Sequence, residues 1–286
     1  MTRSILPDRP LDPTLLHVLS VVSQEADSAG IKYMLVGATA RDLLLTHVFN
    51  GPAGRATYDA DFAVAVANWG EFERLKTGIA SRTGFTSNET SLQRLYYKAK
   101  DGSAGQSYPI DLVPFGEIAS DHGKIVWPPD MAVVMNVAGY DEVLAAAEDV
   151  EVASGLICKV TSLAGLAVMK LMAWSDRGPG DPRDAHDLLQ LMSTYASAGN
   201  EGRLYDTEFA LLEAVDYDLD LAGACLLGKD VARLLKPETR ANLVKLIDSR
   251  HESLMRGMVG AIRQREDAQE RVETPLQQFR SGLLMD

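Results

Sequence analysis

The chain has 286 residues, 46% hydrophobic and 24% charged, a composition typical of a globular protein with one large domain or two smaller ones. Its formal net charge of −12 excludes a protein that coats nucleic acid over its whole surface, because phosphate contacts need Lys and Arg. The 2 cysteines are too few for a disulfide scaffold or a zinc site. Residues 1–12 show no secretory signal, and no apolar run approaches the roughly 18 residues that span a bilayer. We therefore expect a cytoplasmic protein with no membrane contact.

One basic segment departs from this acidic average. Between Lys229 and Arg265 there are nine Lys or Arg and four Asp or Glu, a net charge of +5, which leaves −17 for the remainder of the chain. Such a segment either meets a polyanion locally or forms the solvated face of a helix. We favour the solvated helix face.

Helices and strands alternate in the first half of the chain. Asp12 and Pro13 are typical of a helix start, and the apolar spacing that follows predicts a helix ending near Gly30. The patterns after it predict strands at 31–36, 58–66, 93–100, 107–113, 124–127 and 131–137, with helices at 38–46 and 68–82. Residues 101–106, rich in Gly and Ser, are expected to form a hairpin loop.

After about residue 154 the pattern becomes helical. The predicted helices cover 162–174, 184–195, 207–215, 219–227 and a long run from 237 to about 268. The last residues, 275–286, are expected to be loosely attached. The sequence therefore predicts an α+β protein with a strand-rich domain at 1–155 and a helical domain at 156–286.

Two carboxylates stand in the strand predicted at 58–66. Asp59 and Asp61 are two residues apart, so their side chains share one face, with Cα atoms about 6.6 Å apart. Carboxylates this close repel each other unless a cation lies between them. Hard oxygen ligands favour Mg²⁺ or Mn²⁺ over Zn²⁺. The pair predicts a divalent metal site, and the alternative is a turn or a solvated face.

Asp111 is the candidate third metal ligand. It lies in an apolar run typical of a strand, where an acid is unexpected, although Pro109 and Pro114 would also fit a water-facing edge. Such an acid could accept the proton of an attacking hydroxyl. Gly37, where a strand meets a helix, suits a phosphate because backbone N–H groups and the helix dipole favour an anion, and Thr39 adds a hydroxyl.

These motifs, in this order, resemble the DNA polymerase β-like nucleotidyltransferase superfamily. The resemblance rests on Leu35-Val-Gly37-Ala-Thr39, on Arg55-Ala-Thr57-Tyr-Asp59-Ala-Asp61 and on an acid in a later strand. The Arg-x-Thr-x-Asp-x-Asp string is most similar to the AbiEii branch, the toxins of type IV toxin–antitoxin systems. Leu166-Ala-Val-Met-Lys170 and Arg183-Asp184-Ala-His-Asp187 resemble two further motifs of that branch. The family turn is usually Gly-Ser or Gly-Gly, whereas this chain has Gly37-Ala38.

The resemblance implies a mixed-sheet nucleotidyltransferase palm, followed by a helical domain, that moves a nucleotide from a nucleoside triphosphate (NTP) to a hydroxyl. It implies that Asp59, Asp61 and Asp111 are catalytic and hold Mg²⁺ or Mn²⁺. It implies nucleotide-binding roles for Gly37, Thr39, Arg55, Thr57, Lys170 and Asp184. The implied acceptor is a tRNA and the implied partner a cognate antitoxin. The alternatives are a small-molecule acceptor, as in antibiotic nucleotidyltransferases, or a degenerate transferase scaffold that acts as a binding protein.

Overall fold

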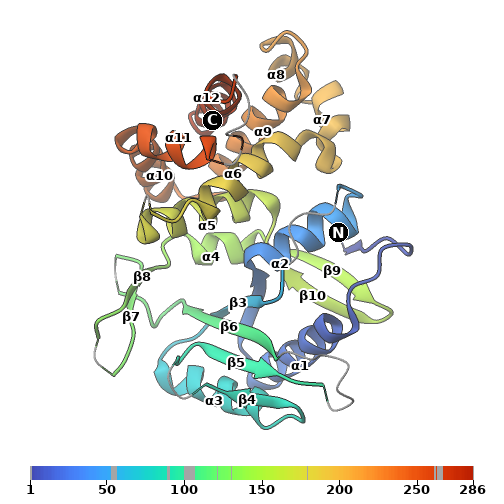
Figure 1. Cartoon of the computed structure of the whole chain (residues 1–286), viewed down its shortest axis with the longest axis vertical. Helices are drawn as coiled ribbons and strands as arrows, with labels where there is room; N and C mark the ends of the chain where they lie inside the picture. Colours follow the sequence, from blue (N-terminus) through green and yellow to red (C-terminus); the bar gives the residue numbers. More distant parts are fainter. Residues whose placement is uncertain are drawn as a thin grey trace. The chain divides into compact units, whose positions relative to one another are not determined.

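The computed structural model of the chain describes residues 2–52, 57–88, 91–99, 107–120, 122–129, 131–178, 180–260, 262 and 267–285. The chain folds into two compact units, Met1–Thr161 and Ser162–Asp286, and each is described by itself. Strands and helices share the first unit, whereas the described residues of the second unit form helices and turns (Figure 1). The fold class is therefore α+β, as predicted.

A mixed sheet is the framework of the first unit. In the described residues its strand order is β1-β9-β10-β2-β3-β6-β5-β4 (Figure 1). The strands are β1 (Arg3–Ser4), β2 (Lys32–Val36), β3 (Ala60–Ala65), β4 (Phe85–Ser87), β5 (Arg94–Tyr97), β6 (Tyr108–Phe115), β9 (Glu148–Ala153) and β10 (Leu156–Val160). A separate ribbon pairs β7 (Lys124–Val126) with β8 (Val134–Asn136). The pairs β3·β6, β2·β10 and β1·β9 are parallel and the other pairs are antiparallel.

Four helices and one π-helical turn accompany this sheet in the described residues. They are α1 (Pro13–Ala29), α2 (Gly37–Asp42), the π-helical turn η1 (Leu43–Val48), α3 (Trp69–Ala80) and α4 (Tyr140–Ala145). The predicted start of α1 is confirmed, because the Asp12 side chain accepts hydrogen bonds from the backbone N–H groups of Thr14 and Leu15. Its predicted end is confirmed as well, at Gly30 with φ +66°.

The two faces of the sheet carry different kinds of residue. Leu35, Phe62 and Leu112 lie next to one another on β2, β3 and β6, and all three are fully buried. One position along these strands, Asp61 of β3 is paired with Asp111 of β6. Because side chains alternate along a strand, the two acids lie on the face opposite this apolar core. The sheet itself therefore brings two candidate site residues side by side.

Four strands, β1, β4, β9 and β10, are absent from the sequence prediction. In β9, the sequence Glu148-Asp-Val-Glu-Val-Ala153 is rich in acids, which are uncommon in strands, so its strand pattern is weak. Val150 and Val152 nevertheless point inward and are buried. Because β10 pairs with both β9 and β2, the first unit includes this strand and extends to Thr161. Asp59 lies one residue before β3 and not inside the strand as predicted. The predicted hairpin loop at 101–106 lies outside the described residues.

The second unit is a set of helices. They are α5 (Leu163–Arg177), α6 (Arg183–Thr194), the π-helical turn η2 (Ala196–Asn200), α7 (Glu201–Tyr205), α8 (Phe209–Glu213), α9 (Leu219–Leu234), α10 (Pro237–Ser249), α11 (His251–Val259) and α12 (Glu270–Leu283). The predicted single helix from 237 to about 268 is wrong, because the backbone leaves helical geometry at Arg250, with φ −123° and ψ 19°. In the part of the chain described, no helix has both the length and the apolar character needed to cross a membrane.

The prediction of a loosely attached C-terminus is wrong. Leu276, Phe279 and Leu283 of α12 are fully buried, and α12 packs along α9 (Figure 1). Arg240 of α10 also donates hydrogen bonds to the carbonyl oxygens of Leu283, at 2.6 Å, and Met285, at 2.8 Å. Pro275 signals a helix break in the sequence, but tertiary packing outweighs it here.

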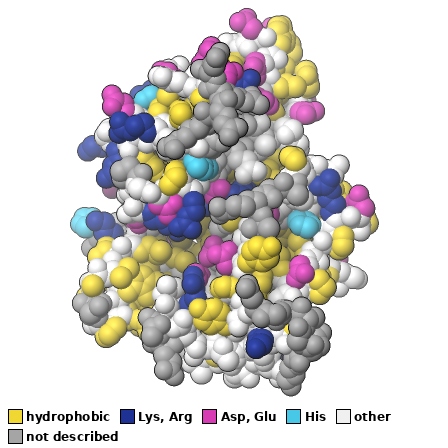
Figure 2. Space-filling view, in the orientation of Figure 1, with side chains coloured by type: hydrophobic (Ala, Val, Ile, Leu, Met, Phe, Trp, Pro, Cys, Tyr) yellow, Lys and Arg dark blue, Asp and Glu magenta, His cyan; other side chains and the backbone are white. Residues whose placement is uncertain are grey.

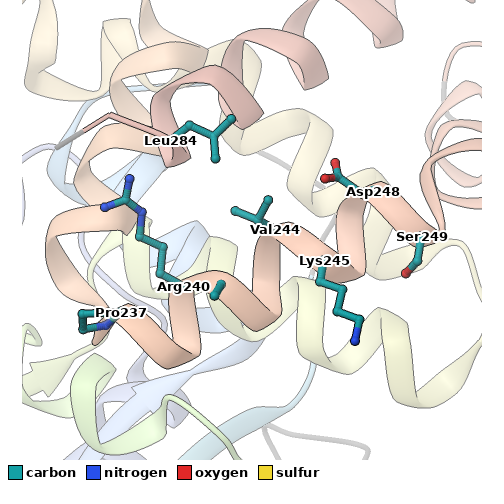
Figure 3. A pocket seen from close by; sticks show the side chains of 8 residues that line it. Pro237, Arg240, Val244, Lys245, Asp248, Ser249 and Leu284 are labelled. Carbon is teal, nitrogen blue, oxygen red and sulfur yellow. The ribbon is translucent and has the colours of Figure 1, made fainter.

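A groove runs along one face of α10 beside the end of α12. Its volume is about 810 Å³, and the close-up in Figure 3 labels the lining residues Pro237, Arg240, Val244, Lys245, Asp248, Ser249 and Leu284. In this view the Arg240 guanidinium is turned toward the C-terminal turn that it anchors. The charged lining residue Asp248 is itself paired with Arg280 of α12. The groove thus lies where α10 supports α12.

Ion pairs engage two residues at the start of the basic segment singled out in the sequence. Lys229 and Arg233 both contact Glu208, and Arg233 also contacts Asp230. On the face drawn in Figure 2, acidic and basic side chains are interspersed over the second unit. Arg263 and Arg265 lie outside the described residues. The contacts made by Lys229 and Arg233 fit a salt-bridged helix face.

Close helix packing makes Gly282 of α12 a sensitive position. A Cβ added there would lie 1.9 Å from the Cys225 carbonyl oxygen of α9, a backbone atom that cannot swing aside. We expect Gly282→Ala to lower the free energy of unfolding by about 2–3 kcal/mol through overpacking. Urea unfolding followed by circular dichroism measures this. Gly202→Ala is the matched control, because nothing lies within 4 Å of its added Cβ; equal effects of the two substitutions would contradict the packing argument.

Candidate active site

The carboxylate of Asp61 lies directly against the turn at Gly37. Val36 of β2 is paired with Asp61 of β3, and the next residue, Gly37, opens α2 with φ +72°. A Cβ added to Gly37 would be only 2.1 Å from Asp61 Oδ2. Glycine is therefore needed here for two reasons, its positive φ and the space that the carboxylate occupies. The strand pairing and the turn together fix the place of Asp61.

Two hydroxyl groups hold the backbone of Asp59. Thr39 Oγ1 donates a hydrogen bond to the Asp59 carbonyl oxygen at 2.5 Å, and the Tyr108 hydroxyl donates to the same oxygen at 3.2 Å. Burial raises the pKa of Tyr108 well above its usual value, and the charges of Asp59 and Asp61 raise it further. The Tyr108 hydroxyl therefore stays protonated, and both acids lie close enough to influence it. The structure directs the Thr39 hydroxyl to the Asp59 backbone.

The segment before Asp59 is tied to α2 through Asp42. The Thr57 hydroxyl donates to Asp42 Oδ2 at 2.8 Å, and two N–H groups of Arg41 donate to Asp42 Oδ1 at 2.9 and 2.7 Å. Arg41 is almost completely buried. These contacts give Thr57 a structural role beside the carboxylates. Arg55, another predicted nucleotide-binding residue, lies outside the described residues.

Asp111 is held by an arginine that was not predicted as a site residue. Arg94 of β5 is paired with Asp111 of β6, and its Nε and Nη2 atoms donate to the two carboxylate oxygens at 2.7 and 2.6 Å. This two-pronged hydrogen bond raises the pKa of the Arg94 guanidinium above its usual value. The strand containing Arg94 was predicted, but a strand pattern does not reveal which residue of a neighbouring strand lies opposite.

The carboxylates have the chemistry that a hard divalent ion requires. Asp61 and Asp111 are neighbours across two strands, and Asp59 precedes Asp61 by two residues. Among the described residues, however, no three His, Cys, Asp or Glu side chains converge on a common point where an ion could lie. Both oxygens of Asp111 are engaged with Arg94. The chemistry of the donor set fits Mg²⁺ or Mn²⁺, with Arg94 as a competing cation on Asp111.

The two site residues predicted in the second unit lie in one ion-pair cluster. Lys170 Nζ of α5 is 3.1 Å from Asp184 Oδ1 and 2.5 Å from Asp187 Oδ2, both on α6. Arg177, which was not predicted, lies 2.5 Å from Asp184 Oδ2. Asp184 is only 1% exposed, so this acid is not a solvated residue at a helix start. Spacing on α5 could have revealed Arg177, which is two turns beyond Lys170 on the same face.

An α+β unit with carboxylates on adjacent strands beside a glycine turn has the features expected of a nucleotidyltransferase. The sequence model of the family described as "Nucleotidyl transferase AbiEii toxin, Type IV TA system" matches residues 23–277. The chain therefore belongs to the AbiEii nucleotidyltransferase family, and the predicted resemblance is confirmed. Among curated proteins, no sequence shows significant similarity to the chain.

The solved structures that match the chain do so at low sequence identity. An antigenic nucleotidyltransferase-like protein from Paracoccidioides brasiliensis is 15% identical, with a TM-score of 0.42, over 72% of this chain and 94% of that one. The antibiotic-resistance factor ANT(2'')-Ia is 15% identical, with a TM-score of 0.37, over 72% and 99%. A CCA-adding enzyme in complex with ATP is 14% identical, with a TM-score of 0.33, over 80% and 56%. Similarities this low carry no conclusion about substrate.

Proposed function

We propose that this chain transfers a nucleotide from an NTP to a hydroxyl of an RNA, with Mg²⁺ or Mn²⁺ as cofactor. The observation that carries this proposal is the position of Asp61, which lies against the Gly37 turn on one side and beside Asp111 on the other. A turn suited to a phosphate and an acid suited to a hydroxyl thus flank the same carboxylate. Membership of the AbiEii family supports the reaction class.

Each residue of the first unit has a separate task in this reaction. Asp59 and Asp61 would hold the divalent ions, which when bound lower the barrier by stabilising charge on the attacking and leaving oxygens. Asp111 would complete the ligand set and accept the proton of the attacking hydroxyl at one carboxylate oxygen. Thr39 and Tyr108 position the Asp59 backbone through their hydrogen bonds. Gly37 leaves room for the Asp61 carboxylate.

The nucleotide-binding set belongs to the same proposal. It consists of Gly37, Thr39, Arg55, Thr57, Lys170 and Asp184. Lys170 would meet a phosphate as a point charge, and Asp184 would orient it through the 3.1 Å contact between them. Because Lys170 is only 12% exposed and already faces two acids, a phosphate would have to replace one of these contacts. Binding of a phosphate by Lys170 therefore requires the loss of one of its two ion pairs.

A tRNA is the acceptor that we infer, together with a cognate antitoxin as partner, because the family consists of toxins of type IV systems. A cytoplasmic site of action belongs to this proposal, since NTPs and tRNA meet there. The second candidate is a small-molecule acceptor, and the net charge of −12 favours it because a polyanion gains little from an acidic body.

Labelled NTPs test the proposal directly. The purified chain is incubated with each NTP in turn, with Mg²⁺ and total RNA, and RNA-bound label is measured after gel separation. We expect label in a small set of RNAs, none after chelation of the metal, and none with Asp59→Asn. Asp149→Asn is the matched control, because Asp149 pairs with Lys159 on β10, away from the carboxylates. Label that reaches no RNA in any reaction would contradict the RNA acceptor.

A further inference from the structure

Three candidate site residues lie in a row across the sheet of the first unit, and the Gly37 turn lies beside one end of this row. Gly37 follows the residue of β2 that is paired with Asp61, Asp61 is paired with Asp111, and Asp111 is paired with Arg94. Paired residues on neighbouring strands direct their side chains to the same face and are about 5 Å apart. Asp111 therefore has a carboxylate on one side and a guanidinium on the other. Its own side chain can reach either neighbour.

In the contact with Arg94, both carboxylate oxygens of Asp111 accept a hydrogen bond. Nε meets Oδ1 at 2.7 Å and Nη2 meets Oδ2 at 2.6 Å, which is the two-pronged geometry of the strongest ion pairs. The Asp111 side chain is 16% exposed and that of Arg94 is 36% exposed. Partial burial strengthens the pair relative to a surface ion pair. The exposed part of Arg94 leaves its guanidinium a path to solvent.

We propose that Arg94 is a positioning residue that competes with the divalent ion for Asp111. This inference rests on the proposed metal-dependent function. An ion on the Asp111 lone pairs that face Arg94 would displace the guanidinium N–H groups, and an ion on the remaining lone pairs would still meet the positive charge of Arg94, so the two cations compete for one carboxylate. Arg94 neutralises Asp111 beside Asp61 when no ion is bound, because adjacent carboxylates repel. The same contact weakens ion binding, since the guanidinium already balances the negative charge that would attract the ion.

The order of residues across the sheet places the competition between Arg94 and the ion at the β5 end of the row. Gly37, the turn suited to a phosphate, lies at the β2 end of the row, and Arg94 lies at the β5 end. A guanidinium released from Asp111 is therefore freed beside the acid that would accept the proton of the attacking hydroxyl. Whether Asp111 binds Arg94 or the ion therefore affects the part of the site where the attacking hydroxyl would lie. It does not affect the glycine turn.

Binding of Mn²⁺ alone, followed by electron paramagnetic resonance, tests this competition without any nucleotide. Full-length wild type is compared with Arg94→Gln, Arg94→Lys and Arg82→Gln. We expect Arg94→Gln to bind Mn²⁺ about tenfold more tightly than wild type, because Asp111 is then free for the ion. Arg94→Lys is expected to lie between them, since lysine keeps the charge without the two-pronged geometry. Arg82→Gln is the matched control, because it breaks a guanidinium–carboxylate pair with Glu25 elsewhere in the first unit.

Thermal unfolding provides a second readout. Without metal, Arg94→Gln should unfold at a lower temperature than wild type, because Asp111 and Asp61 then repel each other. Mn²⁺ should raise its Tm by more than it raises the Tm of wild type, as tighter binding to the folded state requires. If Arg94→Gln does not fold, Arg94→Lys carries the same comparison.

Unchanged or weaker Mn²⁺ binding in both Arg94 variants, with nucleotide transfer intact in wild type, would overturn the competition and leave the proposed function standing. No Mn²⁺ binding in any protein, together with no metal-dependent transfer, would overturn both. A merely structural Arg94 would lower the Tm while leaving the Mn²⁺ affinity of the folded protein at the wild-type value, which also overturns the competition.

Discussion

Asp61→Asn is expected to lower kcat/KM for nucleotide transfer at least about a thousandfold, equivalent to ~4 kcal/mol of transition-state stabilisation. The substitution keeps the shape of the side chain and removes its charge. Asp61 is the carboxylate that lies against Gly37 and beside Asp111, so no neighbouring acid can take its place. Steady-state kinetics at saturating metal measures the loss, and kcat should fall more than NTP binding weakens.

The stability of the Asp61→Asn variant should move in the opposite direction. Removing one of several neighbouring carboxylates relieves repulsion, so Tm without metal should stay level or rise. A variant that lost activity by unfolding would instead show a lower Tm. Asp149→Asn, which changes a half-buried acid of the same unit, should retain wild-type kinetics. Transfer by Asp61→Asn within tenfold of wild type would contradict the assigned role.

Local patterns account for the parts of the fold that were predicted. The capping residue Asp12, the stop at Gly30 and the glycine turn at Gly37 each act within a few residues along the chain, so the sequence signals them directly. The pair of Asp59 and Asp61 was recognisable for the same reason. Asp59 was nevertheless placed inside a strand, because strand ends depend on which residues find partners.

Long-range pairing accounts for what was missed. Asp111 was predicted as a ligand, but only the register of β6 between β3 and β5 places it between Asp61 and Arg94. A strand pattern fixes which residues share a face and does not fix the register with a distant strand. The acidic strand β9 was missed because its partners, and not its composition, make it a strand. Arg94 could not be singled out before that pairing was known.

The second unit shows the same division between local and distant information. Lys170 and Asp184 were recognised from short helical motifs, and the structure joins them in one ion pair. The helix α12 was misjudged, because the prediction rested on its place at the end of the chain, whereas the burial of Phe279 against α9 is a property of the assembled unit. Burial of an apolar helix face outweighs the cost of one poorly placed proline in the first turns.

Gly37→Ala is expected to lower activity mainly because the added Cβ displaces the Asp61 carboxylate, in addition to any effect of backbone strain. Its φ of +72° is unfavourable for alanine, which costs about 1–2 kcal/mol of stability. In addition, the new Cβ would lie 2.1 Å from Asp61 Oδ2 and 3.0 Å from Asp61 Cγ, so the carboxylate has to turn away from its place. Because a metal ligand must be held within a fraction of an ångström, we expect kcat/KM to fall about a hundredfold or more, ~2.7 kcal/mol.

Gly155→Ala separates the two effects of this substitution. Gly155 has φ +75°, nearly the same backbone geometry, but nothing lies within 4 Å of its added Cβ. Both variants should therefore lose a similar amount of stability in urea unfolding, while only Gly37→Ala should lose nucleotide transfer and Mn²⁺ affinity. If Gly155→Ala lost as much activity as Gly37→Ala, backbone strain alone would explain the defect. Activity that survives in Gly37→Ala would show that the position of Asp61 against the turn is not required for transfer.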